Sequence, residues 1–418
     1  MSTQLAQFNV AEGFNPFEPS FIQDPRPLLD YARREEPVFF SPAVNAWVVT
    51  RFTDIERVLR DSEHFTSKDI LSITDLLSPE VRELVGDRVP MEGTLIGVDG
   101  QMHTRLRRVL AHAFTPARIA ELEVDVRELT DGLLADFRRR GSAELVGDVF
   151  LPLPLWTISR LIGIPDDEIS ICREGVEDWA ELSTAYIMGA ELEHQMTLAR
   201  RIIGLHVRIE QLFDERRRRP RNDLITEIVK RQEAEQLTTH EMLSLVPGLF
   251  LAGHETIAQS LALGLYHLLS DRRRWWALID DPSSVDAVVE EILRRDGPVF
   301  GLWRNVTEDT EISGVRVPAG SRLYLSYWAG NVDPQRFEDP AEIDVARASR
   351  LHLAFGRGVH YCIGAPLARM ELRVVLSTLV RDFPDLRLAD DFHPVYRPHF
   401  FLRGLERLDV DSTTYFVR

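Results

Sequence analysis

Residues 352–369 read HLAFGRGVHYCIGAPLAR, and no other part of the chain is as informative. Two glycines in it, Gly356 and Gly358, allow a tight loop that other residues would strain. Cys362 follows this loop, just before a helical pattern at 367–379, so we expect its thiol at a helix N-terminus. Free backbone N–H groups and the positive end of the helix dipole favour a thiolate there. The stretch therefore predicts a cysteine held as a thiolate.

This segment resembles the haem loop of the cytochromes P450, of the soluble bacterial kind. The family pattern Phe-x-x-Gly-x-His/Arg-x-Cys-x-Gly is matched at every fixed position, by Phe355, Gly358, His360, Cys362 and Gly364. The resemblance implies haem b as cofactor, with Cys362 as the proximal iron ligand. It also implies that Phe355 shields the sulfur from water and that Gly364 leaves room for the macrocycle.

A second motif, AGHET at 252–256, lies in an apolar stretch that predicts a long buried helix at 238–269. The Thr256 hydroxyl can bond back to the Ala252 carbonyl and loosen this helix, and Gly253 leaves space beside it. Glu255 is costly in so apolar a helix unless it is paired or working. The resemblance implies that Glu255 and Thr256 deliver protons to iron-bound dioxygen; the alternative for Glu255 is a structural pair with a core arginine. We interpret His254 as a structural partner or part of the pocket rim.

Several cationic or donor groups match the positions that bind haem propionates in the family. His103 and Arg107 are spaced i,i+4 on one helix face, as suits an anionic partner. A solvated basic face is the alternative, and we expect that for the neighbouring Arg105 and Arg108. The complete haem-binding set implied by the resemblance is His103, Arg107, Ala252, Gly253, Arg304, His352, Phe355, Gly356, His360, Cys362 and Gly364.

A third motif, Glu291-x-x-Arg294, matches the family's Glu-x-x-Arg pair. Residues three apart meet across one helical turn, and Arg347 is the expected third member. We interpret the triad as structural, an ion network that braces the loop behind the thiolate.

Composition bounds the rest of the interpretation. The 418 residues contain no linker, repeat or low-complexity block, and we expect one large domain over 1–418. The net charge of −17 argues against nucleic acid and anionic membranes as partners. Two cysteines, no apolar run of membrane-spanning length and no signal-like N-terminus predict a cytoplasmic protein. We expect it to be a monomer.

Hydrophobic periodicity predicts a mainly α fold with a minor antiparallel β component. The resemblance implies a single cytochrome P450-like domain with the haem between a distal and a proximal helix. Besides those named above, the expected helices are 26–33, 52–60, 103–113, 116–139, 192–218 and 284–295. The expected strands are 38–40, 46–50, 311–317 and 322–327, with a turn at 318–320 joining the last two as in a hairpin.

By resemblance, the activity is reductive activation of O2 and insertion of one oxygen into an apolar or aromatic small molecule. No flavin or iron–sulfur motif is present, so we expect a ferredoxin or flavodoxin with its NAD(P)H reductase to supply electrons. It is expected to dock on a basic patch of Arg105, Arg108, Arg357 and Arg369. The substrate pocket is expected from segments 70–97, 179–196, 249–252, 299–302 and 397–401. A peroxide-using peroxygenase and a non-catalytic haem sensor are the alternatives.

Overall fold

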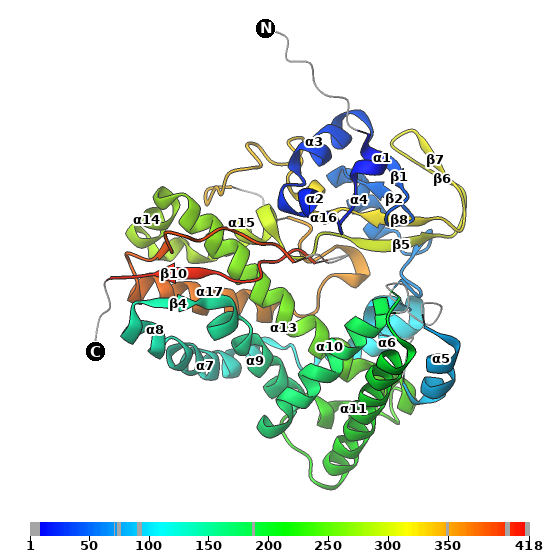
Figure 1. The fold of residues 1–418 in the computed structure, drawn as a ribbon. Coiled ribbons are helices and arrows are strands. Elements are labelled where there is room, and N and C mark those ends of the chain that lie inside the picture. The colour runs from blue at the N-terminus through cyan, green and yellow to red at the C-terminus, as the bar shows by residue number, and fades with distance from the viewer. Residues whose placement is uncertain are drawn as a thin grey trace. The chain divides into compact units, whose positions relative to one another are not determined.

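The structure, a computed structural model, describes residues 9–70, 72, 77–89, 94–185, 189–347, 351–397 and 402–413. Two units of the chain each have their own core. Unit 1 comprises Met1–Thr66, Arg127–Phe150 and Thr256–Arg418, and unit 2 comprises Ser67–Val126 and Leu151–Glu255. Helices dominate both units (Figure 1). The expectation of one domain over 1–418 stays a prediction.

Unit 2 is helical. Its helices are α5 (Pro79–Val85), α6 (Gly100–Ala111), α9 (Pro152–Ile162), α10 (Ile169–Ala185), α11 (Leu192–Arg218) and α12 (Leu224–Arg231), with short 3-10 turns η2 (Gly86–Arg88), η3 (Leu95–Gly97) and η5 (Asp166–Glu168). Helices α5, α10 and α11 share one apolar core that includes Val81, Leu182, Leu198 and Ile202. These residues lose their contact with water, which is the main favourable term in folding.

Two long helices contribute to both units. Helix α7 (Pro116–Leu133) follows a cap in which the Thr115 hydroxyl accepts from the Arg118 N–H at 3.3 Å. Helix α13 (Thr239–Ser270) begins at a capping box: Thr238 and Glu241 each accept the other's backbone N–H, at 3.1 and 2.9 Å. The prediction of a long buried helix here is confirmed.

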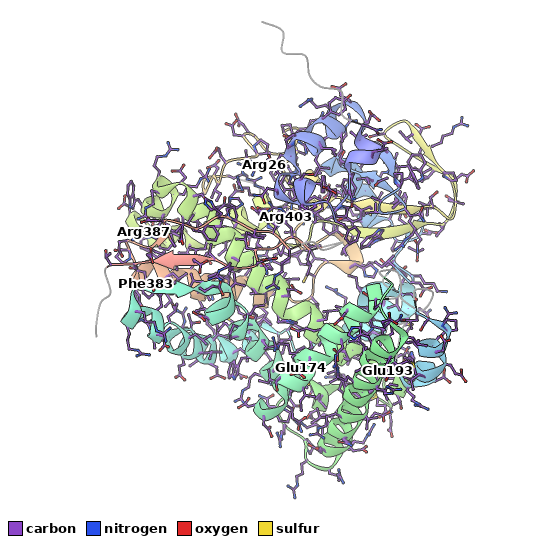
Figure 2. The ribbon with its side chains drawn as sticks, viewed as in Figure 1. Arg26, Glu174, Glu193, Phe383, Arg387 and Arg403 are labelled. Carbon is purple, nitrogen blue, oxygen red and sulfur yellow. The ribbon has the colours of Figure 1, made fainter. Side chains whose placement is uncertain are left out.

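Unit 1 contains short and longer helices along its whole length. They are α1 (Val10–Gly13), α2 (Pro19–Gln23), α3 (Arg26–Glu35), α4 (Phe52–Arg60), α8 (Ala135–Arg140), α14 (Arg272–Asp280), α15 (Val285–Asp296), α16 (Tyr327–Asn331) and α17 (Ala365–Asp382), with a π-helical turn η4 (Val146–Phe150) and 3-10 turns η6 (Pro282–Ser284) and η7 (Gly358–His360). Gly264 lets α13 approach α15 closely, because a Cβ there would lie 2.4 Å from Ile292. Phe383, labelled in Figure 2, stacks on Phe137 with 4.2 Å between ring centroids.

Within the described residues, the strands of unit 1 form three small sheets, which Figure 1 shows in part. Their bounds are β1 (Val38–Ser41), β2 (Ala46–Val49), β3 (Phe65–Thr66), β4 (Ser142–Glu144), β5 (Leu302–Val306), β6 (Thr310–Ile312), β7 (Val315–Val317), β8 (Arg322–Leu325), β9 (Arg387–Leu388) and β10 (Asp409–Asp411). The largest sheet has the order β1-β2-β8-β5-β3, the second β4-β10-β9, and β6 pairs with β7. All pairings are antiparallel except that of β2 with β8.

Two predicted elements are wrong in their boundaries. Residues 311–317 are not one strand, because Ser313 and Gly314 both have positive φ angles of 48° and 81° and form the tight turn between β6 and β7. Strand β8 therefore pairs with β5 and β2 instead of completing the predicted hairpin. The predicted helix 116–139 is interrupted at Leu134, between α7 and α8.

None of the helices in the described parts of the chain combines the length and the apolar character that a transmembrane span needs.

Candidate functional site

The loop before α17 has the backbone that its glycines predict. Gly356 and Gly358 have φ angles of +66° and +70°, a region that glycine enters without strain. A Cβ on Gly358 would lie 2.3 Å from the backbone carbonyl oxygen of Leu59. Any residue other than glycine at position 358 would therefore be strained in its backbone and would clash with Leu59.

Cys362 lies at the end of this loop, and its side chain is exposed. Its backbone N–H donates to the Phe355 carbonyl at 2.9 Å, and Gly364 is the N-cap of α17. Cys172, by contrast, is buried in unit 2, and burial raises the pKa of its thiol to about 12. Of the two cysteines, only Cys362 is both accessible and next to a helix N-terminus, where a thiolate is favoured.

A carboxylate that the sequence analysis did not single out lies behind the loop. Glu290 on α15 accepts from Arg369 at both oxygens, at 2.5 and 2.9 Å, and from His352 Nε2 at 3.2 Å. Burial opposes ionisation of Glu290, but these hydrogen bonds and charges outweigh it and lower its pKa to about 2. The His352 Nδ1 accepts from the Ala354 N–H at 3.2 Å, so both ring nitrogens have partners. The signal available in the sequence was the Glu290-Glu291 doublet, whose two members serve different networks.

The predicted triad around Glu291 is confirmed. Arg294 contacts both Glu291 oxygens at 2.7 and 2.9 Å, and Arg347 contacts one of them at 3.1 Å. Arg294 also donates to the carbonyls of Asn331, Pro340 and Glu342, each within 2.9 Å. Burial raises the pKa of Glu291, and the hydrogen bonds from Arg294 and its neighbours lower it further than that, so the net direction is downward. One buried carboxylate thus fixes the segment 331–347 against α15.

Arg304 lies on β5 and is 3% exposed. Its Nη1 donates to the carbonyl of Trp303 at 2.7 Å. Within the described parts of the chain, no carboxylate pairs with this guanidinium. A buried cation without a counter-charge is costly unless an anionic group reaches it, so this arginine fits a carboxylate-bearing ligand.

The predicted pair on α6 lies in unit 2. His103 is buried, and Arg107 is half-buried one turn further along the same helix. Their contact with a propionate stays a prediction. His360, which belongs to unit 1, closes the short turn η7 two residues before Cys362 and is half-buried.

The predicted basic patch is wrong, because each of its four arginines has a carboxylate nearby. Arg105 bonds to Glu241 and to the carbonyls of residues 235 and 236, and Arg108 bonds to Glu235 at 2.9 Å. The expected solvated face agrees with Arg108, whose side chain is 59% exposed, whereas Arg105 is partly buried against Glu241. Arg369 pairs with Glu290, as described above, and Arg357 lies 3.9 Å from Glu56.

The AGHET segment is continuous α-helix within α13. Ala252 is exposed, whereas Glu255 and Thr256 are half-buried and His254 is buried with its Nδ1 donating to the Phe250 carbonyl at 2.8 Å. The structural role predicted for His254 agrees with this contact. The space expected beside Gly253 is wrong, because a Cβ there would lie 2.7 Å from Ile158 of α9. The predicted bond from the Thr256 hydroxyl to the Ala252 carbonyl stays a prediction.

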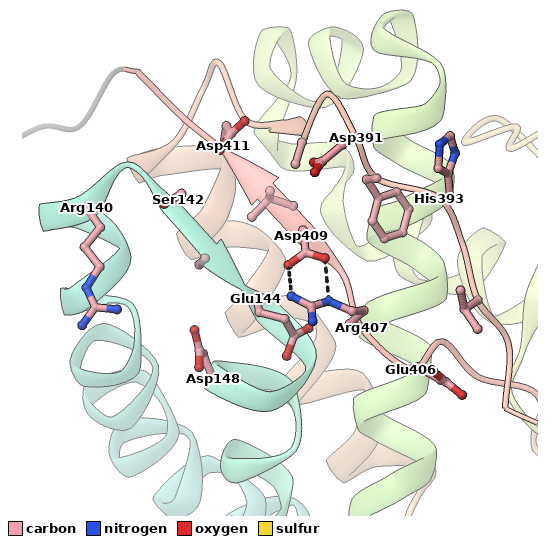
Figure 3. Close-up of a pocket in the computed structure, with 15 residues that line it drawn as sticks. Arg140, Ser142, Glu144, Asp148, Asp391, His393, Glu406, Arg407, Asp409 and Asp411 are labelled. Carbon is pink, nitrogen blue, oxygen red and sulfur yellow. Dashed lines mark hydrogen bonds and ion pairs between the residues drawn. The ribbon is translucent and has the colours of Figure 1, made fainter.

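Three of the predicted pocket segments, 70–97, 179–196 and 397–401, lie partly outside the described residues. A different cavity, of about 630 Å³, lies beside β4, β9 and β10 of unit 1 (Figure 3). Its lining includes the carboxylates of Asp148, Asp391 and Glu406 and the ion pair between Arg407 and Asp409, at 2.7 Å. None of the residues singled out by the sequence lines this cavity.

Comparisons with known proteins agree with the thiolate loop. The family model described as cytochrome P450 matches residues 276–399. Cytochrome P450 107B1 of Saccharopolyspora erythraea is 32% identical over 94% of this chain and 96% of its own length. Nocardicin C N-oxygenase of Nocardia uniformis subsp. tsuyamanensis is 35% identical over 90% and 92% of the two chains. The crystal structure of the P450 heme domain of Tepidiphilus thermophilus has a TM-score of 0.85 at 29% identity and covers 96% of this chain and 97% of its own. The chain belongs to the cytochrome P450 family of haem-dependent monooxygenases.

Proposed function

We propose that this chain reductively activates O2 and inserts one oxygen atom into an apolar or aromatic small molecule, with Cys362 as the iron ligand. One observation carries the proposal: the Cys362 thiol is exposed at the N-terminus of α17, after a loop that only glycine at position 358 permits. Bound haem supplies the oxygen chemistry, and a thiolate ligand donates electron density that favours O–O cleavage.

The residues present fit haem b. Arg304 is the strongest support, because its buried guanidinium has no carboxylate partner within the described residues and a haem propionate supplies one. We assign the same role to His103, Arg107 and His360 from their places in the family motifs. We assign His352 instead to the network around Glu290, since both of its ring nitrogens are engaged there. Phe355, Gly356 and Gly364 complete the thiolate side.

On the opposite side of the haem we assign Ala252, Glu255 and Thr256 of α13. The exposed methyl of Ala252 marks the face of α13 that we place against the macrocycle. Glu255 and Thr256 offer a carboxyl and a hydroxyl that can hold and pass protons to a reacting oxygen. Gly253, which the sequence places with them, we assign to packing of α13 against α9.

Electrons are proposed to come from a ferredoxin or flavodoxin with its NAD(P)H reductase. The four arginines expected to form its docking site are engaged in ion pairs, and we assign no docking role to them. The substrate is proposed to be a small apolar or aromatic molecule. A relative named as an N-oxygenase supports oxygen insertion as the reaction. A monomeric state is part of the same proposal.

The test compares two ways of driving the enzyme. Purified protein is screened for ligands that shift the spin state of the iron, and the best ligand is then incubated with ferredoxin, reductase and NADPH, or with hydrogen peroxide. We expect oxygenated product in the first reaction. Product only with peroxide would support a peroxygenase instead, and no product in either reaction would support a haem sensor.

The proton-delivery role has its own variant and control. Thr256→Ala is expected to divert NADPH-derived electrons from product into peroxide, because the hydroxyl that passes protons is lost. Ser260→Ala removes another hydroxyl from the same helix, one that donates to the Thr256 carbonyl at 2.8 Å, and is expected to keep the coupling. Equal coupling in Thr256→Ala and wild type would contradict the assignment.

A further inference from the structure

We infer that Glu290 is a positioning residue that holds Phe355 over the Cys362 sulfur, through two of the side chains that contact the Phe355 ring. This inference rests on the proposed function, because it gives Phe355 the task of keeping water from a thiolate ligand. Glu290 contacts neither Phe355 nor Cys362 in the hydrogen bonds that it makes, so its influence passes through its partners.

The first partner is Arg369. Its guanidinium forms a two-point pair with Glu290, and its Cζ lies 4.6 Å from the centroid of the Phe355 ring. A two-point pair fixes the plane of a guanidinium, which a single hydrogen bond does not. The cation is thereby held against the face of the ring, where the ring's quadrupole attracts it.

The second partner is His352. Its Nε2 contacts the same carboxylate at 3.2 Å, and its ring lies 5.9 Å from the Phe355 ring at an interplanar angle of 42°. A neutral imidazole satisfies both of its contacts, with Nε2 donating to Glu290 and Nδ1 accepting from Ala354. One carboxylate therefore orients two of the groups that restrain the ring; the third, Tyr361, lies 6.2 Å from it and accepts a hydrogen bond from Arg369 at 3.1 Å.

The restrained ring is coupled to the ligand residue itself. The Phe355 carbonyl accepts the Cys362 N–H at 2.9 Å, so Phe355 is hydrogen-bonded directly to the backbone of the ligand residue. A ring that is free to rotate leaves the sulfur open to water and to protonation. Partners one contact away from a metal ligand commonly tune the metal in this way.

The test follows the reduced carbon monoxide complex of the haem-loaded protein. Glu290→Gln keeps the size of the side chain and removes its charge, and Arg369→Lys keeps the cation but loses the flat contact with the ring. Both variants are expected to take up haem and to convert faster from the thiolate-type to the thiol-type spectrum. Without the two-point pair, the lysine ammonium is not held over the ring, and loss of that cation–π contact predicts a rate increase of roughly two- to thirtyfold for Arg369→Lys. The control is Asp286→Asn on the same helix. The Asp286 carboxylate is exposed, and the Arg373 guanidinium is as far away from it as 4.0 Å. This variant is expected to convert at the wild-type rate.

A double-mutant cycle separates positioning from charge and from general stability. In a Phe355→Leu background the ring is absent, so adding Glu290→Gln is expected to change the conversion rate little. An equal effect of Glu290→Gln with and without the ring would overturn the inference, as would a wild-type rate in Glu290→Gln itself. If the wild-type protein itself gave no thiolate-type spectrum, the proposed function would be overturned. That result differs from a wild-type conversion rate in Glu290→Gln, which would overturn only the inference about Glu290.

Discussion

Replacing Glu291 by glutamine tests the ion network that braces the thiolate loop. Arg294 has an exposed side-chain fraction of 1%, and Glu291 one of 6%, so neither charge is solvated by water. Removing one partner of a buried ion pair costs about 3–5 kcal/mol, because the other charge stays buried without compensation. Arg294 keeps three hydrogen bonds to backbone carbonyls, and we therefore expect the lower end, a loss of about 3 kcal/mol of unfolding free energy.

The measurement is urea denaturation followed by far-UV circular dichroism, on wild type, Glu291→Gln and a control. Glu342→Gln is a suitable control because its carboxylate is 63% exposed and pairs with Arg274 at the surface. Exposed pairs of this kind contribute about 0–1 kcal/mol. If both variants lost less than about 1 kcal/mol, the buried pair would not be bracing the loop as the burial of Arg294 implies.

Three further perturbations address the loop, the propionate site and pH. Gly358→Ala forces a positive φ and a contact with the Leu59 carbonyl, so we expect haem content after purification to fall sharply, whereas full haem content would contradict the loop geometry. Arg304→Met removes a buried cation, so thermal unfolding should show a more stable haem-free protein while titration shows weaker haem binding; unchanged haem affinity would remove Arg304 from the site. The pKa of Glu290 is lowered from 4.5 to about 2, so its stabilisation is complete above about pH 5 and is lost as pH falls towards 2. The urea midpoint should fall less steeply with falling pH in Glu290→Gln than in wild type. Parallel plots of midpoint against pH for the two proteins would contradict a lowered pKa of Glu290 in the folded state.

Local signals in the sequence are sufficient to predict the conformation of the thiolate loop. Gly356 and Gly358 report a backbone conformation, and Cys362 is positioned by chain continuity alone, so no distant contact had to be known. The Glu291–Arg294 pair is equally local, at one helical turn. Long helices such as α11 and α13 were predicted for the same reason, since their periodicity and caps lie within the segment.

Predictions from the sequence are wrong where the structure depends on contacts between distant residues or on the conformation of a two-residue turn. The hairpin turn at Ser313-Gly314 was missed because Ser is an unusual residue at a positive φ. Pairing of β8 with β2 places Leu323 opposite Trp47, 276 positions away in the chain (323 − 47), which no local pattern specifies. The four-arginine patch failed because charge counts do not reveal which carboxylate each arginine will meet.

Glu290 was overlooked for a related reason. It precedes the recognised Glu291 directly, and only the fold shows that the two side chains serve separate networks. Its partner Arg369 lies 79 positions along the chain, so the pair has no signature in a single sequence. Gly253 shows the reverse case, in which a motif glycine matters for helix packing where the sequence suggested open space.

The bond between the Cys362 sulfur and iron can be tested with the two cysteines of the chain as a matched pair. Haem-loaded wild type, Cys362→Ser and Cys172→Ser are reduced under carbon monoxide and their absorption spectra compared. Wild type and Cys172→Ser should give the thiolate-type spectrum, since Cys172 is buried elsewhere, and Cys362→Ser should lose it. A thiolate-type spectrum that survives in Cys362→Ser, or one that disappears in Cys172→Ser alone, would contradict this account.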